Sequence, residues 1–318
     1  MNNDNKRHLP RANIMTKAFL VACLFLVHQV TAAQPEKESP PLKKIKILSW
    51  NIYMLPHLVA THSDKKERAI IIGETLLASD YDLIFFQEAF HSTARNKILV
   101  QLQTKFPFHA GPANKKLFSI KANSGLWIFS KYPIVKSESI IYKNKFGIDA
   151  LSRKGALLVE LNVQGQRIQI AGTHLQNCGP VWLRQVQCVE FYERLLKPNA
   201  REGVPQIICG DFNIDRYSTK EDYRFMLRAL DAKDGNDEVN QYSYDRINND
   251  LHVEKGNRKD LIDYILFRSN SGLATCSNSV TPIKRRWSSK HSDLSDHYAI
   301  QAEINFSNLN LSTVALAK

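Results

Sequence analysis

Six polar clusters interrupt the otherwise apolar framework of this 318-residue chain. Each cluster lies at one end or the other of a segment that reads as a β-strand, and strand ends are where sheets place ligands and catalytic groups. Together they hold carboxylates, side-chain amides and two histidines, which are the groups needed to hydrolyse a phosphodiester beside a hard metal ion. The clusters are residues 49–51, 87–88, 173–174, 210–213, 262–264 and 295–297.

Any one cluster is a weak indication of function. A lone His174 is more often an ordinary core or surface histidine, Glu88 could be a charge at a helix N-terminus, and Asp263 could be a capping residue. All six occurring in this order favour a phosphodiester site. Glu88, together with Asn51, can supply oxygen ligands for the metal, because Mg²⁺ takes oxygen ligands and often only one or two carboxylates from the protein.

The remaining polar residues predict acid–base chemistry. Asp211 and Asn213 are two apart on a segment expected to be extended, so their side chains should point to the same side. One could orient the attacking water while the other hydrogen-bonds phosphate. Of His174 and His297, one could be the general base, and the other, when protonated, could stabilise the phosphate charge. Asp263 is a candidate to fix the tautomer of a histidine.

Eight apolar runs of five to eight residues predict the strands that position these groups. Several are apolar at every position, which indicates sheets covered on both faces. The pattern predicts one α/β domain over residues 44–306, a four-layer sandwich with two mixed sheets face to face and helices outside. The runs are 45–50, 83–87, 126–130, 156–163, 168–173, 206–210, 262–267 and 299–304.

Helices are expected between the strands. A capping-box pattern at 64–67 predicts a helix start ahead of a periodic apolar pattern. A second helix is expected to bury the face formed by Leu183, Val186, Val189, Tyr192 and Leu196. A polar surface loop is expected at 231–249.

The N-terminal region predicts export. A basic start, an apolar stretch at 18–27 and small residues ending at Ala33 are typical of a signal peptide over residues 1–33, with Met15 as an alternative start. The apolar stretch is too short to span a bilayer. A linker at 34–43 and a C-terminal tail at 307–318 complete the prediction of a secreted or periplasmic protein. The formal charge of +12 falls to +9 without the signal peptide, which still favours anionic partners.

Four cysteines remain after the predicted signal peptide, which contains Cys23. Four thiols allow three full pairings, and export makes a disulfide feasible. Cys178 and Cys188 could close a short loop, whereas Cys209, in an apolar run, is expected to be a buried thiol. The chain has no Cys-x-x-Cys pair, which disfavours a structural zinc site.

The motif set resembles the endonuclease/exonuclease/phosphatase superfamily, the deoxyribonuclease-like fold, from about residue 45 to 304. The resemblance implies a two-sheet sandwich, a catalytic divalent metal and in-line attack on a phosphoester. It also implies a metal site at Glu88 and Asn51, with Asp296 as a supporting or second-metal carboxylate. The motifs are Ser-Trp-Asn at 49–51, Gln-Glu at 87–88, Gly-Thr-His at 172–174, Gly-Asp-Phe-Asn at 210–213, Asp-Tyr-Ile at 263–265 and Ser-Asp-His at 295–297.

The same resemblance implies roles for the other site residues. His297 would be the general base, oriented by Asp263, and His174 would lie on the phosphate. Asp211 and Asn213 would contact the water and the phosphate. The implied metal is Mg²⁺, with Mn²⁺ and Co²⁺ as alternatives.

Shorter motifs favour one branch of the superfamily. Segments 51–56, 149–155, 172–178 and 242–249 resemble secreted bacterial sphingomyelinases C, and the Trp-Cys-Asp-Arg element of phosphoinositide phosphatases is absent at 261–264. The resemblance implies a monomer that hydrolyses sphingomyelin to ceramide and phosphocholine at a phospholipid membrane surface. The alternatives are a secreted Mg²⁺-dependent nuclease acting on nucleic acid, another phospholipase C-type enzyme, or a membrane-binding effector with little activity. The effector is disfavoured because the whole site set is present.

A basic segment before the last cluster is the candidate membrane contact. Gram-positive sphingomyelinases often carry a long aromatic hairpin here, but residues 281–294 offer little beyond Lys284, Arg285, Arg286 and Trp287. The segment could be a basic loop with one tryptophan at a lipid interface. Equally, it could be a solvated loop whose tryptophan packs on the sandwich.

Overall fold

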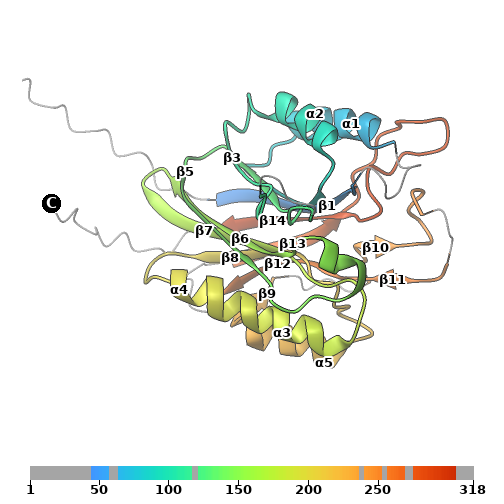
Figure 1. Cartoon of the computed structure of the whole chain (residues 1–318). Helices are drawn as coiled ribbons and strands as arrows, with labels where there is room; N and C mark the ends of the chain where they lie inside the picture. Colours follow the sequence, from blue (N-terminus) through green and yellow to red (C-terminus); the bar gives the residue numbers. More distant parts are fainter. Residues whose placement is uncertain are drawn as a thin grey trace, which may run out of the picture. The chain divides into compact units, whose positions relative to one another are not determined.

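Two six-stranded mixed sheets pack face to face, with helices on both outer sides (Figure 1). The computed structural model describes residues 44–56, 64–116, 121–235, 240–252, 256–268 and 275–305. The predicted signal peptide, linker and C-terminal tail lie outside these residues, so export stays a prediction. Within the described ranges, no helix has the length and apolar character needed to cross a membrane.

Each sheet has one parallel strand pair among antiparallel ones. The parallel pairs are β1–β2 in the first sheet and β7–β8 in the second. The first sheet has the order β13 (Thr275–Thr281), β14 (Ala299–Asn305), β1 (Lys44–Met54), β2 (Leu83–Ala89), β4 (Trp127–Ser130) and β3 (Phe108–Ala110). The second has the order β5 (Ile134–Ile141), β6 (Gly155–Val163), β7 (Gln166–His174), β8 (Gln206–Asp211), β12 (Asp263–Arg268) and β9 (Ala232–Asp234). A small ribbon pairs β10 (Tyr244–Asp245) with β11 (Lys259–Asp260).

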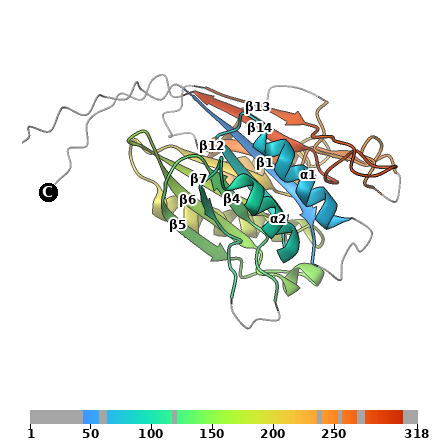
Figure 2. The ribbon, with the colours of Figure 1, turned by 90° about the horizontal axis from the view of Figure 1, so that it is seen from above.

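The helices divide between the two outer faces. Helices α1 (Lys65–Leu77) and α2 (Ser92–Leu102) lie over the first sheet (Figure 2). Helix α3 (Val181–Phe191), which continues through a π-helical turn (Tyr192–Leu196) into α4 (Lys197–Asn199), covers the second sheet together with α5 (Lys220–Ala229). The predicted four-layer sandwich is confirmed.

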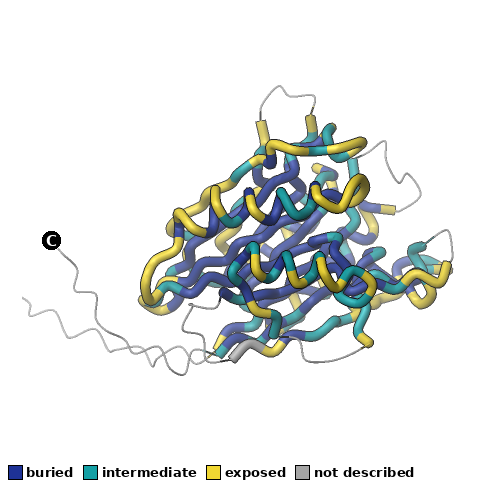
Figure 3. Tube along the Cα trace, turned by 90° about the horizontal axis from the view of Figure 1, so that it is seen from below, coloured by how far each residue is buried: buried dark blue, intermediate teal, exposed yellow. Residues whose placement is uncertain are grey.

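Strand β1 explains why an apolar run without alternation forms a strand here. Ile45 and Ile47 belong to the core between the sheets, whereas Leu48, Trp50 and Ile52 belong to the core under α1 and α2. Successive side chains of a strand point to opposite faces, so a strand covered on both sides is apolar throughout. Figure 3 shows the strands buried and the outer helix surfaces exposed.

All eight predicted strands are confirmed, but edge strands were missed. Strand β5 has the sequence IVKSESII and is largely exposed, and β13 has the sequence TCSNSVT. Both lie at the edge of a sheet, where one side pairs with nothing and polar residues are favoured. Such strands lack the apolar pattern on which the prediction relied.

The helix predictions need two corrections. Helix α1 begins after Asp64 as expected, but Asp64 has a left-handed φ of 37° and its side chain makes no capping hydrogen bond. In α3 the predicted face is partly wrong, because Val189 is 43% exposed whereas Gln187 is fully buried. Gln187 faces inward because its side chain hydrogen-bonds the backbone of Gln176 and Asn144.

The expected surface loop at 231–249 is also wrong for its described part. It contains β9 and β10, and Ser243 and Asn249 in it are fully buried.

Cys178 and Cys188 are free thiols, so they do not form the loop-closing pair, and Cys209 is buried as predicted. The side chain of Cys276 is outside the described residues.

Gly172 marks a close contact between the two sheets. A Cβ built on Gly172 would lie 2.2 Å from the ring of Phe85 in β2. We expect Gly172→Ala to lower the free energy of unfolding by about 1–3 kcal/mol, because overpacking in a filled core forces side chains and strands apart. Denaturant unfolding measures this. Gly256→Ala is the control, because its Cβ would meet only ordinary contacts at 3.7 Å or more; equal effects of both substitutions would contradict the prediction.

Candidate active site

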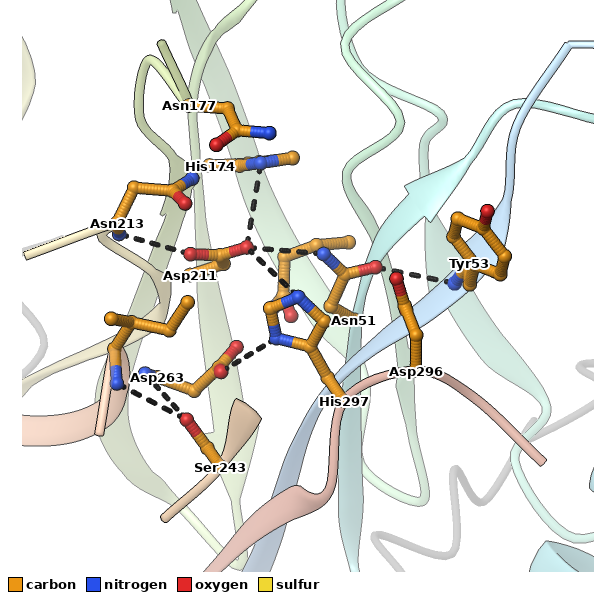
Figure 4. Close-up of polar contacts among 12 residues, drawn as sticks. Asn51, Tyr53, His174, Asn177, Asp211, Asn213, Ser243, Asp263, Asp296 and His297 are labelled. Atoms are coloured by element: carbon orange, nitrogen blue, oxygen red, sulfur yellow. Dashed lines mark hydrogen bonds and ion pairs between the residues drawn. The ribbon is translucent and has the colours of Figure 1, made fainter. Parts of the chain in front are cut away.

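Three predicted site residues form a row across neighbouring strands of the second sheet. His174 on β7 is paired with Asp211 on β8, and Asp211 is paired with Asp263 on β12. Paired residues on adjacent strands lie side by side on one face of the sheet. All three side chains are buried, and His174 Nε2 lies 3.4 Å from Asp211 Oδ2 (Figure 4).

The first sheet contributes Asn51 and Glu88. Asn51 on β1 pairs with Gln87 on β2, so Glu88 follows directly at the end of that strand. Asn51 Nδ2 donates a 3.1 Å hydrogen bond to Asp211 Oδ2, which joins the two sheets at the site (Figure 4). Tyr53 and Glu88 both have left-handed backbones, with φ of 51° and 56°. Non-glycine residues seldom adopt this conformation, and such positions cluster at functional sites.

His297 completes the cluster from the loop before β14. Its Nδ1–H donates to Asp263 Oδ2 at 2.8 Å, and its Nε2 lies 3.8 Å from Asp211 Oδ2. The backbone carbonyl of His297 accepts a 2.9 Å hydrogen bond from the indole N–H of Trp50. The Asp263–His297 contact is the one that the predicted orienting role requires.

The cluster has an excess of buried negative charge. Burial and the neighbouring carboxylate of Asp263 raise the pKa of Asp211 to about 7. Burial and the charge of Asp296 raise the pKa of Glu88 to about 8. Burial lowers the pKa of His297, but the carboxylates of Asp263 and Asp211 outweigh it, so this pKa lies well above its ordinary value. A positive ion placed here would relieve the repulsion.

The pKa of His174 is shifted in the opposite direction to that of His297. Burial, followed by the charges of Lys154 and His297, holds the pKa of His174 well below its ordinary value. Its Nδ1 is buried and has no hydrogen-bond partner among the described residues. His174 is therefore neutral near pH 7, whereas the sequence prediction offered a protonated histidine for the phosphate. An anionic phosphate beside the ring would favour the protonated form.

The donor atoms present fit a divalent cation. One metal-competent group in the described part of the chain comprises Asp211, Asp263 and His297, whose ligand atoms lie within 4.8 Å of one another. The predicted metal ligands Glu88, Asn51 and Asp296 are not in that group. Glu88 nevertheless offers a second position for a cation, because its Oε2 is buried and has no hydrogen-bond partner among the described residues. An unpartnered buried carboxylate oxygen is costly unless a cation or a proton compensates it.

Asn213 reaches the site by a different route from the one predicted. Strand β8 ends at Asp211, and Asn213 has a left-handed φ of 52°, so the argument from extended alternation is wrong. Asn213 still lies beside Asp211, because its backbone N–H donates to Asp211 Oδ1 at 2.9 Å. Its side-chain amide donates to the carbonyl of Leu175, next to His174, at 3.3 Å.

Two buried cations at the site were not predicted as site residues. Lys154 is 2% exposed, and its Nζ contacts Asp149 Oδ2 at 3.1 Å and the carbonyl of Leu175 at 2.8 Å. It lies close enough to lower the pKa values of His174 and Asp211. Lys154 belongs to the 149–155 motif, so that resemblance was the signal for it.

Arg68 on α1 is the second cation, and it is fully buried. It donates to the carbonyls of Ile52, Tyr53 and Leu294 at 2.7–3.1 Å. These bonds tie the end of β1, which carries Asn51, to the loop that carries Asp296 and His297. A charged residue within the apolar pattern of α1 was the only signal in the sequence.

The basic loop does not present a tryptophan to solvent. Trp287 is 8% exposed, packs in the core under α1 and α2, and donates its indole N–H to the carbonyl of Asp293 at 2.7 Å. The prediction of Trp287 as a membrane anchor is therefore wrong, because its ring is part of the sandwich. Lys284 pairs with buried Asp293 at 3.0 Å and Arg285 pairs with Glu74 at 2.8 Å. Within the loop, the exposed Arg286 donates to the carbonyl of Ser289.

Comparison with known proteins decides the family. The model of the Endonuclease/Exonuclease/phosphatase family matches residues 48–297, which include every cluster described above. The chain belongs to this family. The expected superfamily membership and fold are thus confirmed.

Similar proteins within the family narrow the class of enzyme. The chain is 25% identical to a phospholipase C from Staphylococcus aureus, covering 89% of this chain and 94% of that protein. It is 24% identical to a sphingomyelinase C from Bacillus cereus, covering 86% and 93%. These names support a phosphoric diester hydrolase.

A solved structure shows the same fold. A double mutant of beta toxin from Staphylococcus aureus, crystallised with bound magnesium ions, superposes with a TM-score of 0.74. The identity is 23%, and the match covers 82% of this chain and 99% of the toxin.

Glu88 gives a direct test of the metal assignment. We expect Glu88→Gln to weaken Mg²⁺ binding by about tenfold or more, because the amide cannot provide the negative charge that a hard cation prefers. Titration calorimetry with Mg²⁺ alone measures this. Glu193→Gln is the control, because Glu193 is exposed and pairs only with Lys197 in the described structure. Unchanged affinity in Glu88→Gln would remove Glu88 from the metal site.

Proposed function

We propose that this protein is a divalent-metal-dependent phosphodiesterase that hydrolyses sphingomyelin to ceramide and phosphocholine. The observation that carries the proposal is the buried cluster in which His297 bonds Asp263 at 2.8 Å while its other ring nitrogen faces Asp211. Relatives named sphingomyelinase C and phospholipase C supply the choice of substrate class. Magnesium is the metal we propose, since a structural relative contains it.

The general base is His297. Asp263 accepts the Nδ1–H of His297, so the Nε2 lone pair is directed to the side where Asp211 lies. Nε2 takes a proton from water, and Asp211 orients that water while it attacks phosphorus in line with the departing ceramide oxygen. The buried side chain of Asp211 is itself fixed by the Asn51 amide.

The developing charge on phosphate meets a separate set of groups. Asn213 and Lys154 both donate to the carbonyl of Leu175, the residue after His174, and His174 is paired with Asp211 on the neighbouring strand. These donors stabilise equatorial phosphate oxygens as negative charge develops. A divalent cation held by Glu88 and Asn51, with Asp296 nearby, would add positive charge for the phosphate and offset the carboxylates that raise the pKa of His297.

The proposal includes the setting of the reaction. The predicted signal peptide at 1–33 would export the enzyme as a monomer to a phospholipid surface. Mn²⁺ and Co²⁺ remain alternatives to Mg²⁺ in the same oxygen-rich site.

A substrate panel tests the proposal. Purified protein is assayed with Mg²⁺ on sphingomyelin vesicles, phosphatidylcholine vesicles and single- and double-stranded DNA, each with and without a chelator. We expect phosphocholine release from sphingomyelin, lost on chelation. Hydrolysis of DNA alone would make the protein a nuclease, and equal hydrolysis of both lipids would make it a broader phospholipase C. Activity that survives chelation would refute the metal-dependent mechanism.

Removing the proposed base gives the second test. We expect His297→Ala to lower kcat on sphingomyelin by about 10²–10⁴-fold, since the substitution removes the group that takes the proton from water. Binding to the same vesicles should persist, which separates lost chemistry from lost folding. His109→Ala is the matched control, because His109 is an exposed histidine on β3. Near-normal kcat in His297→Ala would show that another residue is the base.

A further inference from the structure

An exposed apolar surface lies beside the active site. Phe146, Ile148 and Leu151 in and next to the 3-10 helix η1 (Gly147–Leu151) are 55%, 65% and 66% exposed. Val181 and Trp182 at the start of α3 are 42% and 55% exposed. We call these five residues the apolar rim. Large apolar side chains are normally stabilised by burial, so several exposed together indicate a partner.

The two segments of the rim are in contact. A Cβ built on Gly179, two residues before Val181, would lie 3.0 Å from the ring of Phe146. A Cβ on Gly147 would lie 3.7 Å from the sulfur of Cys178. Figure 1 shows η1, in green, and the beginning of α3 at the same end of the domain as β10. The loop that leads into α3 therefore lies against the segment that carries Phe146 and η1.

The rim is attached directly to the strand end that carries His174. Buried Gln176 accepts from the backbone N–H of Phe146 at 3.1 Å and donates to the Phe146 carbonyl at 2.9 Å. The backbone N–H of Asn177 donates to Asp149 Oδ2 at 3.0 Å, and the same oxygen pairs with Lys154. These bonds hold η1 at a set position against residues 174–177. Anything bound to the rim is thus held close to the strand end that carries His174.

The charge around the rim suits a phosphate-bearing surface. Residues 141–155 contain Lys143, Lys145 and Arg153, while the buried Lys154 pairs with Asp149, the only acid in this segment. Lys143 is exposed, and Lys145 and Arg153 are partly exposed. Basic side chains that flank apolar ones match a bilayer surface, where phosphates lie above acyl chains.

Trp182 is far more exposed to solvent than the other three tryptophans of the chain. Trp50, Trp127 and Trp287 are 1%, 2% and 8% exposed, and the chain has four in total. Tryptophan favours the boundary between water and hydrocarbon, because its ring is apolar and its N–H is polar. Residues 284–287 were one candidate for the membrane contact, but Phe146 and Trp182 of the rim are more exposed than Phe108 or Trp287.

We propose that the apolar rim is the surface on which this protein docks to a phospholipid bilayer, with Trp182, Ile148 and Leu151 entering the interface. Docking there holds headgroup phosphates next to His174 and Lys154. This inference rests on the proposed action on a lipid substrate and names the part of the molecule that meets the membrane.

Trp182 fluorescence provides the first test. Wild-type protein is mixed with sphingomyelin–phosphatidylcholine vesicles in the presence of a chelator, so that binding occurs without turnover. We expect a blue shift and protection from acrylamide quenching, both lost in Trp182→Phe. An unchanged spectrum in protein that has sedimented with vesicles would overturn the proposal, because the buried tryptophans leave Trp182 as the reporter.

Paired substitutions provide the second test. We expect Ile148→Ser with Leu151→Ser to weaken vesicle binding by about tenfold or more, since two apolar side chains no longer enter the interface. The matched control is Val100→Ser with Val135→Ser, which changes two side chains that are 65% and 45% exposed elsewhere on the surface and should bind as wild type. Turnover of a water-soluble nitrophenyl phosphodiester monitors folding, and the ratio of vesicle to soluble activity should fall at least about fivefold in the rim variant alone.

The outcomes separate this inference from the proposed function. If sphingomyelin is hydrolysed but the rim variant binds vesicles as tightly as wild type, docking at the rim is wrong and the proposed function stands. If the rim binds vesicles but no lipid is hydrolysed, the docking inference stands and the proposed function fails. If the rim substitutions convert a dimer to a monomer in size-exclusion chromatography without changing vesicle binding, the rim is a contact between two copies and the inference is overturned.

Discussion

The face-to-face packing of the two sheets is the constraint on which the rest of this structure depends. Each sheet alone presents only part of the site, and the parts meet because both sets of strand ends lie at one end of the sandwich. The hydrogen bond from Asn51 to Asp211 crosses between the sheets at that point. The sheets approach closely enough for this bond because a glycine, Gly172, lies opposite the ring of Phe85. Catalytic geometry therefore depends on core packing.

The site concentrates buried charge at a cost in stability. Carboxylates without full compensation, a histidine kept neutral by burial and strained backbones at Tyr53 and Glu88 are all unfavourable for folding. Arg68 and Lys154 offset part of this cost, because Arg68 lies near Asp296 and Glu88, Lys154 pairs with Asp149, and both satisfy backbone carbonyls. A divalent cation would supply more of the missing positive charge. The local conflict with ordinary folding rules is itself an indication of function.

Two tryptophans show how burial changes an interpretation made from sequence. Trp287 follows three basic residues, which is typical of an interfacial loop, yet its ring lies in a core and two of those cations pair with acids. Trp182 follows an ordinary Gly-Pro-Val segment, yet it is exposed beside the catalytic strand end. Both tryptophans are compatible with a membrane contact in the sequence. Only the accessible surface distinguishes them.

The sequence alone determined the strands that are apolar on both faces, the α/β class and most of the site set. These features are local, since a doubly covered strand must be apolar throughout and motifs at strand ends keep their spacing along the chain. Edge strands, the buried Gln187 and the turn at Asn213 could not be read locally, because partners distant in sequence decide whether a polar group is satisfied when buried.

The tertiary structure alone decided two further features. It placed Arg68 between two site segments, and it left Trp182 exposed while burying Trp287. Each depends on contacts between residues far apart in the chain, and composition and spacing carry no record of such contacts.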